Sequence, residues 1–253
     1  MWSDTKAIYS SAWTFAFACP ILFLIPALLE MAQHVVEMKI GMYQSWASAK
    51  AVEHSNWRSI FGTIKELSLL LPGYWFIRYL GYGNNAEHAR QIDLRAFGLW
   101  LVIFIISAFL SAWSLFGPSV GSMLALTGKA AVIAAIALAG VQLVIGIYLT
   151  AWVVAWPLGN GAIGPIKSSK IMLGYFWRAF AYYVTGMLPL LVLHYALGLG
   201  AIGRPEWLVW PMMIIDALVT AMLALTLTGN MWFAARYAAR AKGVSLLPSS
   251  YFS

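Results

Sequence analysis

Glu30, His34 and Glu37 are the side chains whose types and spacing best fit chemistry. Spacings of four and three residues place all three on one face of a helix. Carboxylate and imidazole groups on one face can hold a divalent metal ion. Di-iron and dimanganese bundles also need matching Glu-x-x-His sets on other helices, and the sequence has none. The pattern therefore favours a solvated helix end just beyond the first apolar run, and a metal site is the alternative.

His194 and Asp216 form a second candidate set, because they lie in the last two long apolar runs. An antiparallel hairpin that turns near Gly203 would bring the two side chains within reach of each other. Such an intramembrane pair can relay protons or balance charge. It can equally form a structural hydrogen bond between helices, which is the interpretation that the sequence favours. A lone membrane histidine can also ligate a haem or chlorophyll metal, but no second feature supports a pigment.

Apolar segments along the whole chain must position these side chains. Hydrophobic residues make up 62% of the 253 residues and charged residues 10%, whereas soluble domains have about 45–50% and roughly 25%. A span needs about 20 apolar residues to cross roughly 30 Å of hydrocarbon. We therefore expect an all-α, polytopic transmembrane helical bundle that forms one membrane domain over residues 1–253. Its predicted spans lie near residues 11–33, 60–82, 96–116, 130–157, 176–199 and 208–235.

The second of these six spans is the weakest. Lys65 and Glu66 lie near its start, and Pro72-Gly73 interrupts it. Five spans plus a re-entrant or interfacial segment is therefore the alternative to six. The distribution of Lys and Arg places the C-terminus in the cytoplasm in both arrangements, and the N-terminus inside only with six spans. We prefer six, because an apolar, aromatic-rich segment is unusual for a soluble loop.

Charge, cysteine content and motifs limit the function classes. The net charge of +7 is interpreted as loop charge of a membrane protein, since no basic run typical of nucleic-acid binding is present. Cys19 is the only cysteine, which excludes an intrachain disulfide and a cysteine-based metal cluster. A nucleophile elbow and a nucleotide-binding loop are both missing. Enzymatic activity stays open but is disfavoured. No cofactor is predicted, although bound lipid is compatible with the sequence.

Two helix-entry segments carry a resemblance to a known family. Lys6 to Pro26 runs from a short polar segment through an Ala-Trp entry into a proline-containing span. Later, Phe176-Trp177-Arg178 leads into the Leu-Pro-Leu-Leu run at 188–191. In these features the chain resembles the bacterial membrane-domain family named after the membrane portion of glycerophosphodiester phosphodiesterase. The resemblance implies about six helices and no catalytic residues, because the phosphodiesterase catalytic domain has no counterpart in this sequence.

Three functions remain open on the sequence alone. The preferred one is a non-catalytic subunit, scaffold or assembly factor of a membrane complex, supported by the small residues Ala131, Ala135 and Ala139 spaced four apart. The second is a small-molecule or lipid transporter that uses His194 and Asp216. The third is a membrane enzyme or cofactor carrier. We expect localisation in a bacterial inner (cytoplasmic) membrane. The expected partners are lipids and other membrane subunits or copies of the chain, without nucleic acid.

Overall fold

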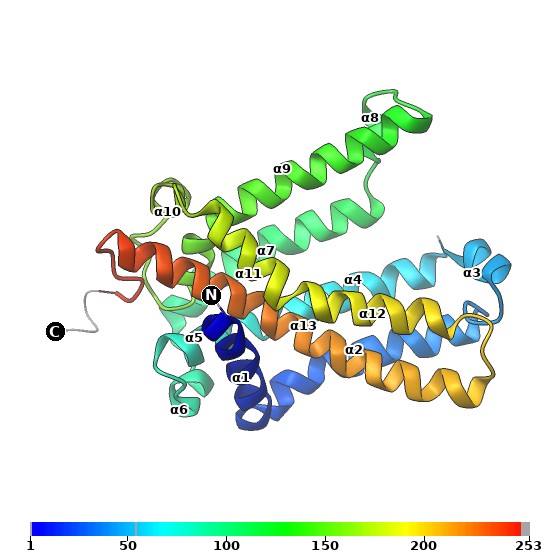
Figure 1. Cartoon of the computed structure of the whole chain (residues 1–253), viewed down its shortest axis with the longest axis horizontal. Coiled ribbons are helices and arrows are strands. Elements are labelled where there is room, and N and C mark those ends of the chain that lie inside the picture. Colours follow the sequence, from blue (N-terminus) through cyan, green and yellow to red (C-terminus); the bar gives the residue numbers. More distant parts are fainter. Residues whose placement is uncertain (1, 54, 249–253) are drawn as a thin grey trace. The chain divides into compact units, whose positions relative to one another are not determined.

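The computed structural model describes residues 2–53 and 55–248, and within these ranges every regular element is a helix (Figure 1). The all-α prediction is therefore confirmed. Five helical stretches are long and apolar enough to cross a membrane. They are α2 (Pro20–Lys39), α7 (Leu94–Phe116), α9 (Gly128–Ala155), α11 to α12 (Phe176–Ala201) and α13 (Glu206–Ala241). The chain is thus a helical protein with the lengths and apolar composition of a membrane protein.

The first predicted span is wrong in its bounds. The helix breaks at Cys19, between α1 (Trp2–Ala18) and α2 (Pro20–Lys39). Pro20 has no N–H to continue the preceding helix, but its fixed φ suits the first position of a new one. Pro26 is accommodated inside α2. As a result, Glu30 lies near the middle of a helix that continues to Lys39, and not at its end.

The predicted segment 60–82 is two helices and not one. α4 (Asn56–Leu70) and α5 (Gly73–Gly81) are separated at Leu71 and Pro72. Neither helix alone is long enough to be one of the five candidate spans. Four shorter helices are also described, namely α3 (Trp46–Val52), α6 (Ala86–Arg90), α8 (Val120–Met123) and α10 (Pro165–Met172).

Contacts divide the chain into two compact units, each built from two stretches of sequence. Unit 1 comprises Met1–Gln91 and Tyr182–Asn230, and unit 2 comprises Ile92–Ala181 and Met231–Ser253. Unit 1 therefore holds α1 to α6, α12 and the first part of α13, and unit 2 holds α7 to α10. The organisation of the chain as a single membrane domain stays a prediction.

In unit 1, α4 lies antiparallel to α2. The Arg58 Nε atom at the start of α4 is 3.0 Å from Glu37 Oε1 near the end of α2. Further along α4, Lys65 Nζ is 3.3 Å from Glu30 Oε2 in the middle of α2. The following helix, α5, then packs on the end of α1, where the Phe15 and Phe76 ring centroids are 4.9 Å apart. Residues 56–81 thus return along α2 to the end where α2 began.

The hairpin of α12 (Leu188–Ala201) and α13 completes the packing of unit 1. Gly203, with φ of +77°, makes the turn, and its N–H donates to the Tyr43 carbonyl at 2.8 Å. A positive φ of this size favours glycine, which has no Cβ to clash. The turn therefore lies beside the chain segment that follows α2. A small apolar core holds this end together and consists of Tyr43, Ala201, Ile202, Val209 and Met213.

Candidate functional site

The three predicted side chains of α2 are buried and do not form a solvated helix end. Glu30 is 1% exposed, His34 3% and Glu37 3%. Asp216, on α13, is 0% exposed and lies among them. The interpretation as a solvated end is therefore wrong. It assumed that the apolar run ended at Leu29, whereas α2 continues for a further ten residues to Lys39 and is covered by α4 and by the hairpin.

His34 is the centre of the buried cluster. Its Nε2 atom lies 3.0 Å from Asp216 Oδ2 and 3.3 Å from Glu30 Oε1. Its Nδ1 atom lies 2.9 Å from the Tyr43 hydroxyl and 3.3 Å from Glu37 Oε2. Glu30 and Glu37 therefore contact opposite nitrogens of one imidazole ring. Because one ion can take only one of these nitrogens, the predicted metal set of Glu30, His34 and Glu37 does not converge on a single point.

Glu37 is held by several hydrogen-bond donors. Its Oε1 accepts from Gln33 Nε2 at 3.0 Å and from Arg58 Nε at 3.0 Å. Its Oε2 accepts from the Tyr43 hydroxyl at 2.7 Å. Burial, together with the nearby charge of Glu37, raises the pKa of Tyr43, so the phenol keeps its proton and remains a donor. The Glu37 carboxylate is thus fully bonded and has little capacity for a further ligand.

Lys65 and Arg58 are site residues that the sequence interpretation missed. Lys65 Nζ lies 3.4 Å from Glu30 Oε1 and 3.3 Å from Glu30 Oε2, next to the Arg58–Glu37 ion pair described above. A signal for both pairs exists in the sequence. Glu30 and Glu37 are seven residues apart, and so are Arg58 and Lys65. Two helical turns cover about seven residues, so two antiparallel helices with these spacings can form both pairs at once.

The structure brings His194 and Asp216 together. His194 Nδ1 lies 2.8 Å from Asp216 Oδ1, and the Thr220 hydroxyl lies 3.2 Å from the same nitrogen. The second carboxylate oxygen of Asp216 faces His34, as described above. Asp216 therefore joins two histidines from different helices, and only the contact with His194 was expected from the sequence.

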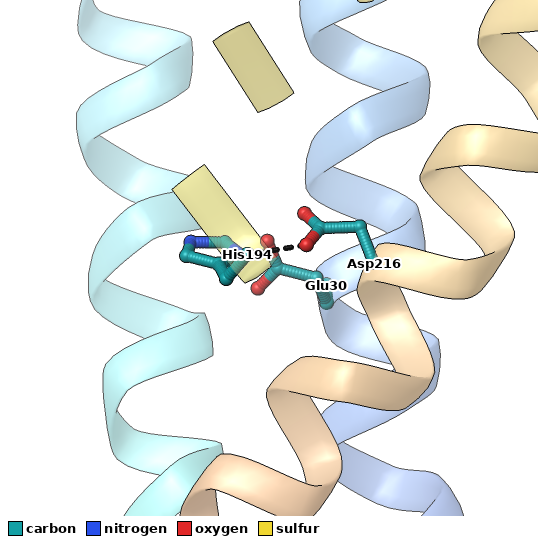
Figure 2. Close-up of side chains that lie close together, drawn as sticks. All are labelled: Glu30, His194 and Asp216. Carbon is teal, nitrogen blue, oxygen red and sulfur yellow. Dashed lines mark hydrogen bonds and ion pairs between the residues drawn. The ribbon is translucent and has the colours of Figure 1, made fainter. Parts of the chain in front are cut away.

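Glu30, His194 and Asp216 form the group of side chains best placed to share one ligand. They come from α2, α12 and α13, and Figure 2 shows their side chains close together. One possible ligand atom from each lies within 4.8 Å of the other two. Separations of this size allow a small cation to contact all three after side-chain movements of about 1 Å, given metal–ligand distances of about 2.0–2.2 Å.

The cluster lines a cavity of about 150 Å³. The described lining residues include three carboxylates, on Glu30, Glu37 and Asp216, and two permanent cations, on Arg58 and Lys65. Before the histidines are counted, the lining therefore has an excess of one negative charge. Arg58 pairs with Glu37 and Lys65 pairs with Glu30, whereas Asp216 faces two histidines. Asp216 is therefore the carboxylate of the lining that is most open to a positively charged ligand.

A larger pocket lies at the end of the same helices. Its volume is about 480 Å³, and its wall includes Lys39 at the end of α2, together with Arg204 and Trp210 near the start of α13. Tyr43 lines this pocket and also the inner cavity. Tyr43 is thus shared by the two cavities.

No family model matches the sequence, and no match was found among curated proteins or solved structures. The resemblance to the membrane domains associated with glycerophosphodiester phosphodiesterase stays a prediction, carried by the two segments that enter the first and fifth apolar runs. Function must therefore be inferred from the chemistry of the buried cluster.

Proposed function

We propose that this protein is an integral membrane transporter of small cationic solutes and that the cavity beside Glu30, His194 and Asp216 is its substrate site. The observation that carries the proposal is the burial of several ionisable side chains around one cavity, on helices otherwise apolar enough to cross a membrane. Charged groups in such helices are costly, and they commonly mark ion and substrate pathways.

The depth of the cluster supports a substrate site within the membrane. Asp216 lies ten residues after Glu206, where α13 begins. At 1.5 Å per residue this is a rise of about 15 Å, which is half of the roughly 30 Å hydrocarbon thickness. Glu30 lies nine residues before Lys39, where α2 ends, which is a rise of about 14 Å. Substrate sites of many transporters lie at this midplane depth.

The pocket at the helix ends provides a route toward the site. Tyr43 lines both this pocket and the inner cavity and is itself only 5% exposed. A change in the Tyr43 side chain would join the two spaces. We place Tyr43 as the residue that controls entry from this side.

We further propose six membrane crossings, with α4 and α5 together forming the second. α4 returns along α2, and its apolar side chains Trp57, Ile60 and Ile64 are 62%, 44% and 40% exposed. Arg58 and Lys65 on the same helix instead face carboxylates of α2. A helix with apolar residues outward and ion pairs inward is suited to lipid.

Six crossings place both termini on the cytoplasmic side of the bacterial inner membrane. Basic residues then gather on the cytoplasmic side, as the positive-inside tendency requires. They include Lys6, Arg78, Arg90, Arg95, Lys167, Lys170, Arg236, Arg240 and Lys242.

A flux assay with reconstituted protein tests the transport proposal. Proteoliposomes would be loaded with indicator dyes and exposed to Na⁺, K⁺, methylammonium or Mn²⁺. We expect protein-dependent flux of at least one cation, and its loss in Asp216→Asn. Glu87→Gln is the matched control, because it also removes one carboxylate but Glu87 is exposed on α6. Flux that is equal in Asp216→Asn and in the unmodified chain would contradict the proposal.

The second candidate function is a subunit, scaffold or assembly factor of a membrane complex. It is favoured by α9, because only 6% of the residues in an 18-residue apolar stretch of this helix are buried. Ala135 and Ala139 of α9 are exposed. Such a helix can pack against a partner helix as well as against lipid. Native mass spectrometry of the chain extracted in mild detergent tests this function. Reproducible co-purifying protein mass is the expected result, and a bare chain would count against it.

A further inference from the structure

We propose that the cation is a divalent transition-metal ion, bound by carboxylate oxygens of Glu30 and Asp216 and by Nδ1 of His194. This inference rests on the proposed transport function for its role, but the binding site itself can be tested separately. The set differs from the one expected on α2 alone, since its three ligands come from three helices.

The donor chemistry selects the class of ion. Two carboxylates and one imidazole suit Mn²⁺, Fe²⁺, Co²⁺ or Zn²⁺, whereas Ca²⁺ takes six to eight oxygen ligands. The cluster contains no cysteine, because the single Cys19 lies in the break between α1 and α2. A thiolate-dependent ion such as Cu⁺ is therefore not the one we propose.

The geometry leaves room for the ion and its water. Since a water molecule takes about 30 Å³, the cavity of about 150 Å³ can hold an ion with several waters that complete its coordination. Gln33 lines the same cavity, and its buried Oε1 has no hydrogen-bond partner among the described residues. A buried amide oxygen without a donor is costly, and a water bound to the ion would supply one.

His194 is the histidine available to the ion. Both nitrogens of His34 face hydrogen-bond partners on opposite sides of its ring. By contrast, His194 Nδ1 faces the carboxylate of Asp216, and its side chain is 20% exposed. An ion between them would replace the hydrogen of this bond, and the ring proton would then reside on Nε2.

Lys65 acts as a competitor for the ion. Its ammonium group lies 3.3 Å from Glu30 Oε2, and its side chain is 18% exposed. A flexible lysine that reaches solvent can leave the carboxylate when an ion arrives. Because like charges repel strongly at such short distances, removal of the Lys65 charge should tighten metal binding.

The first experiment measures binding of Mn²⁺ and Zn²⁺ to the full chain, purified in detergent and stripped with a chelator. Titration against a competing chromophoric chelator gives affinity and stoichiometry. We expect one ion per chain, bound at least about 100-fold more weakly in Asp216→Asn, Glu30→Gln and His194→Gln, since loss of an outer-shell partner alone costs 10–100-fold. Glu87→Gln should bind like the unmodified chain.

A further variant, Lys65→Gln, distinguishes loss of a metal ligand from misfolding. We expect it to bind Mn²⁺ or Zn²⁺ about tenfold more tightly, because a misfolded protein would not gain affinity. Lys129→Gln is the matched control, since Lys129 is exposed at the start of α9. Unchanged affinity in Lys65→Gln, or in the three ligand variants, would overturn the metal site.

The flux assay separates failure of the metal site from failure of transport. Asp216-dependent flux of methylammonium without binding of Mn²⁺ or Zn²⁺ overturns the metal inference and leaves the transport proposal standing. Ligand-dependent metal binding without flux of any cation supports the metal site and contradicts transport. Binding together with Asp216-dependent Mn²⁺ flux supports both.

Discussion

The two units of the molecule bury polar side chains in different ways. In unit 2, the Ser168 hydroxyl donates to the Tyr148 backbone carbonyl at 2.8 Å and accepts from the Trp152 backbone N–H at 3.0 Å. The Asn160 amide donates to backbone carbonyls of residues 245–247. In unit 1, ionisable side chains bond to one another across helices, as Arg58 does to Glu37 and His194 to Asp216. Neutral groups bonded to backbone hold a fold together, whereas a charged network can also exchange its partners with a ligand.

The long apolar helices also differ in how much of their surface is buried. In an 18-residue apolar stretch of each helix, 33% of the residues of α2 and 50% of those of α13 are buried. The corresponding shares in α7 and α9 are 11% and 6%. Of the long helices that carry the charged cluster, α2 and α13 are therefore the more enclosed, whereas the stretch α11 to α12 with His194 is 11% buried, like α7. In α7 and α9, by contrast, most residues of these apolar stretches are not buried.

The largest effect on stability is expected for Glu37→Ala in unit 1. The substitution leaves Arg58, Tyr43 and His34 without their shared carboxylate. Loss of one member of a buried ion pair costs about 3–5 kcal/mol, and the 31% exposure of the Arg58 side chain places the expected loss at the lower end of this range. Denaturant titration in detergent measures the loss, and reaction of the buried Cys19 thiol can report unfolding. Glu87→Ala is the control, and a loss no larger than that of the control would contradict the network.

A smaller effect is expected for Asn160→Ala in unit 2. Three backbone carbonyls lose the Asn160 amide at distances of 3.2–3.3 Å. A neutral hydrogen-bonded group of this kind contributes about 1–3 kcal/mol when its partners remain buried. The same unfolding titration compares it with Glu37→Ala. A loss as large as that of Glu37→Ala would remove the energetic difference between the units.

Ser168→Ala should cost less again, about 0.5–1.5 kcal/mol. The hydroxyl bridges the Tyr148 carbonyl and the Trp152 backbone N–H, both on α9. The free energy of unfolding of this variant, measured beside Asn160→Ala, gives the contribution of a single buried hydroxyl. No loss at all would show that this bridge is dispensable.

The smallest effect is expected for Ile136→Ala on α9. Ile136 is 67% exposed, and substitutions at such positions usually change stability by less than about 0.5 kcal/mol. Unfolding in detergent measures this change in the free energy of unfolding. A much larger loss in the native membrane than in detergent would instead identify α9 as a surface that binds another protein.

Part of the candidate site is visible in the sequence. The hairpin near Gly203 predicts that His194 and Asp216 come within reach, and their atoms lie 2.8 Å apart. The face of α2 with Glu30, His34 and Glu37 also follows from helical periodicity. The side chains that contact that face do not follow from the periodicity of α2. Tyr43 lies in a turn, and Lys65 was noted only as a charge near the start of the weakest predicted span.

The sequence by itself determined the all-α class and the positions of the long apolar runs, but not every helix break, since one span was expected across Pro20. Apolar composition sums locally along the chain, so long runs predict helices with the length of membrane spans, and Pro20 and Pro72 interrupt them. Only the tertiary structure decided that His34 meets Asp216, 182 residues away. That contact depends on the rotation of α2 and α13 about their axes. The rotation is set by the packing of every neighbouring helix and leaves no local signal in the sequence.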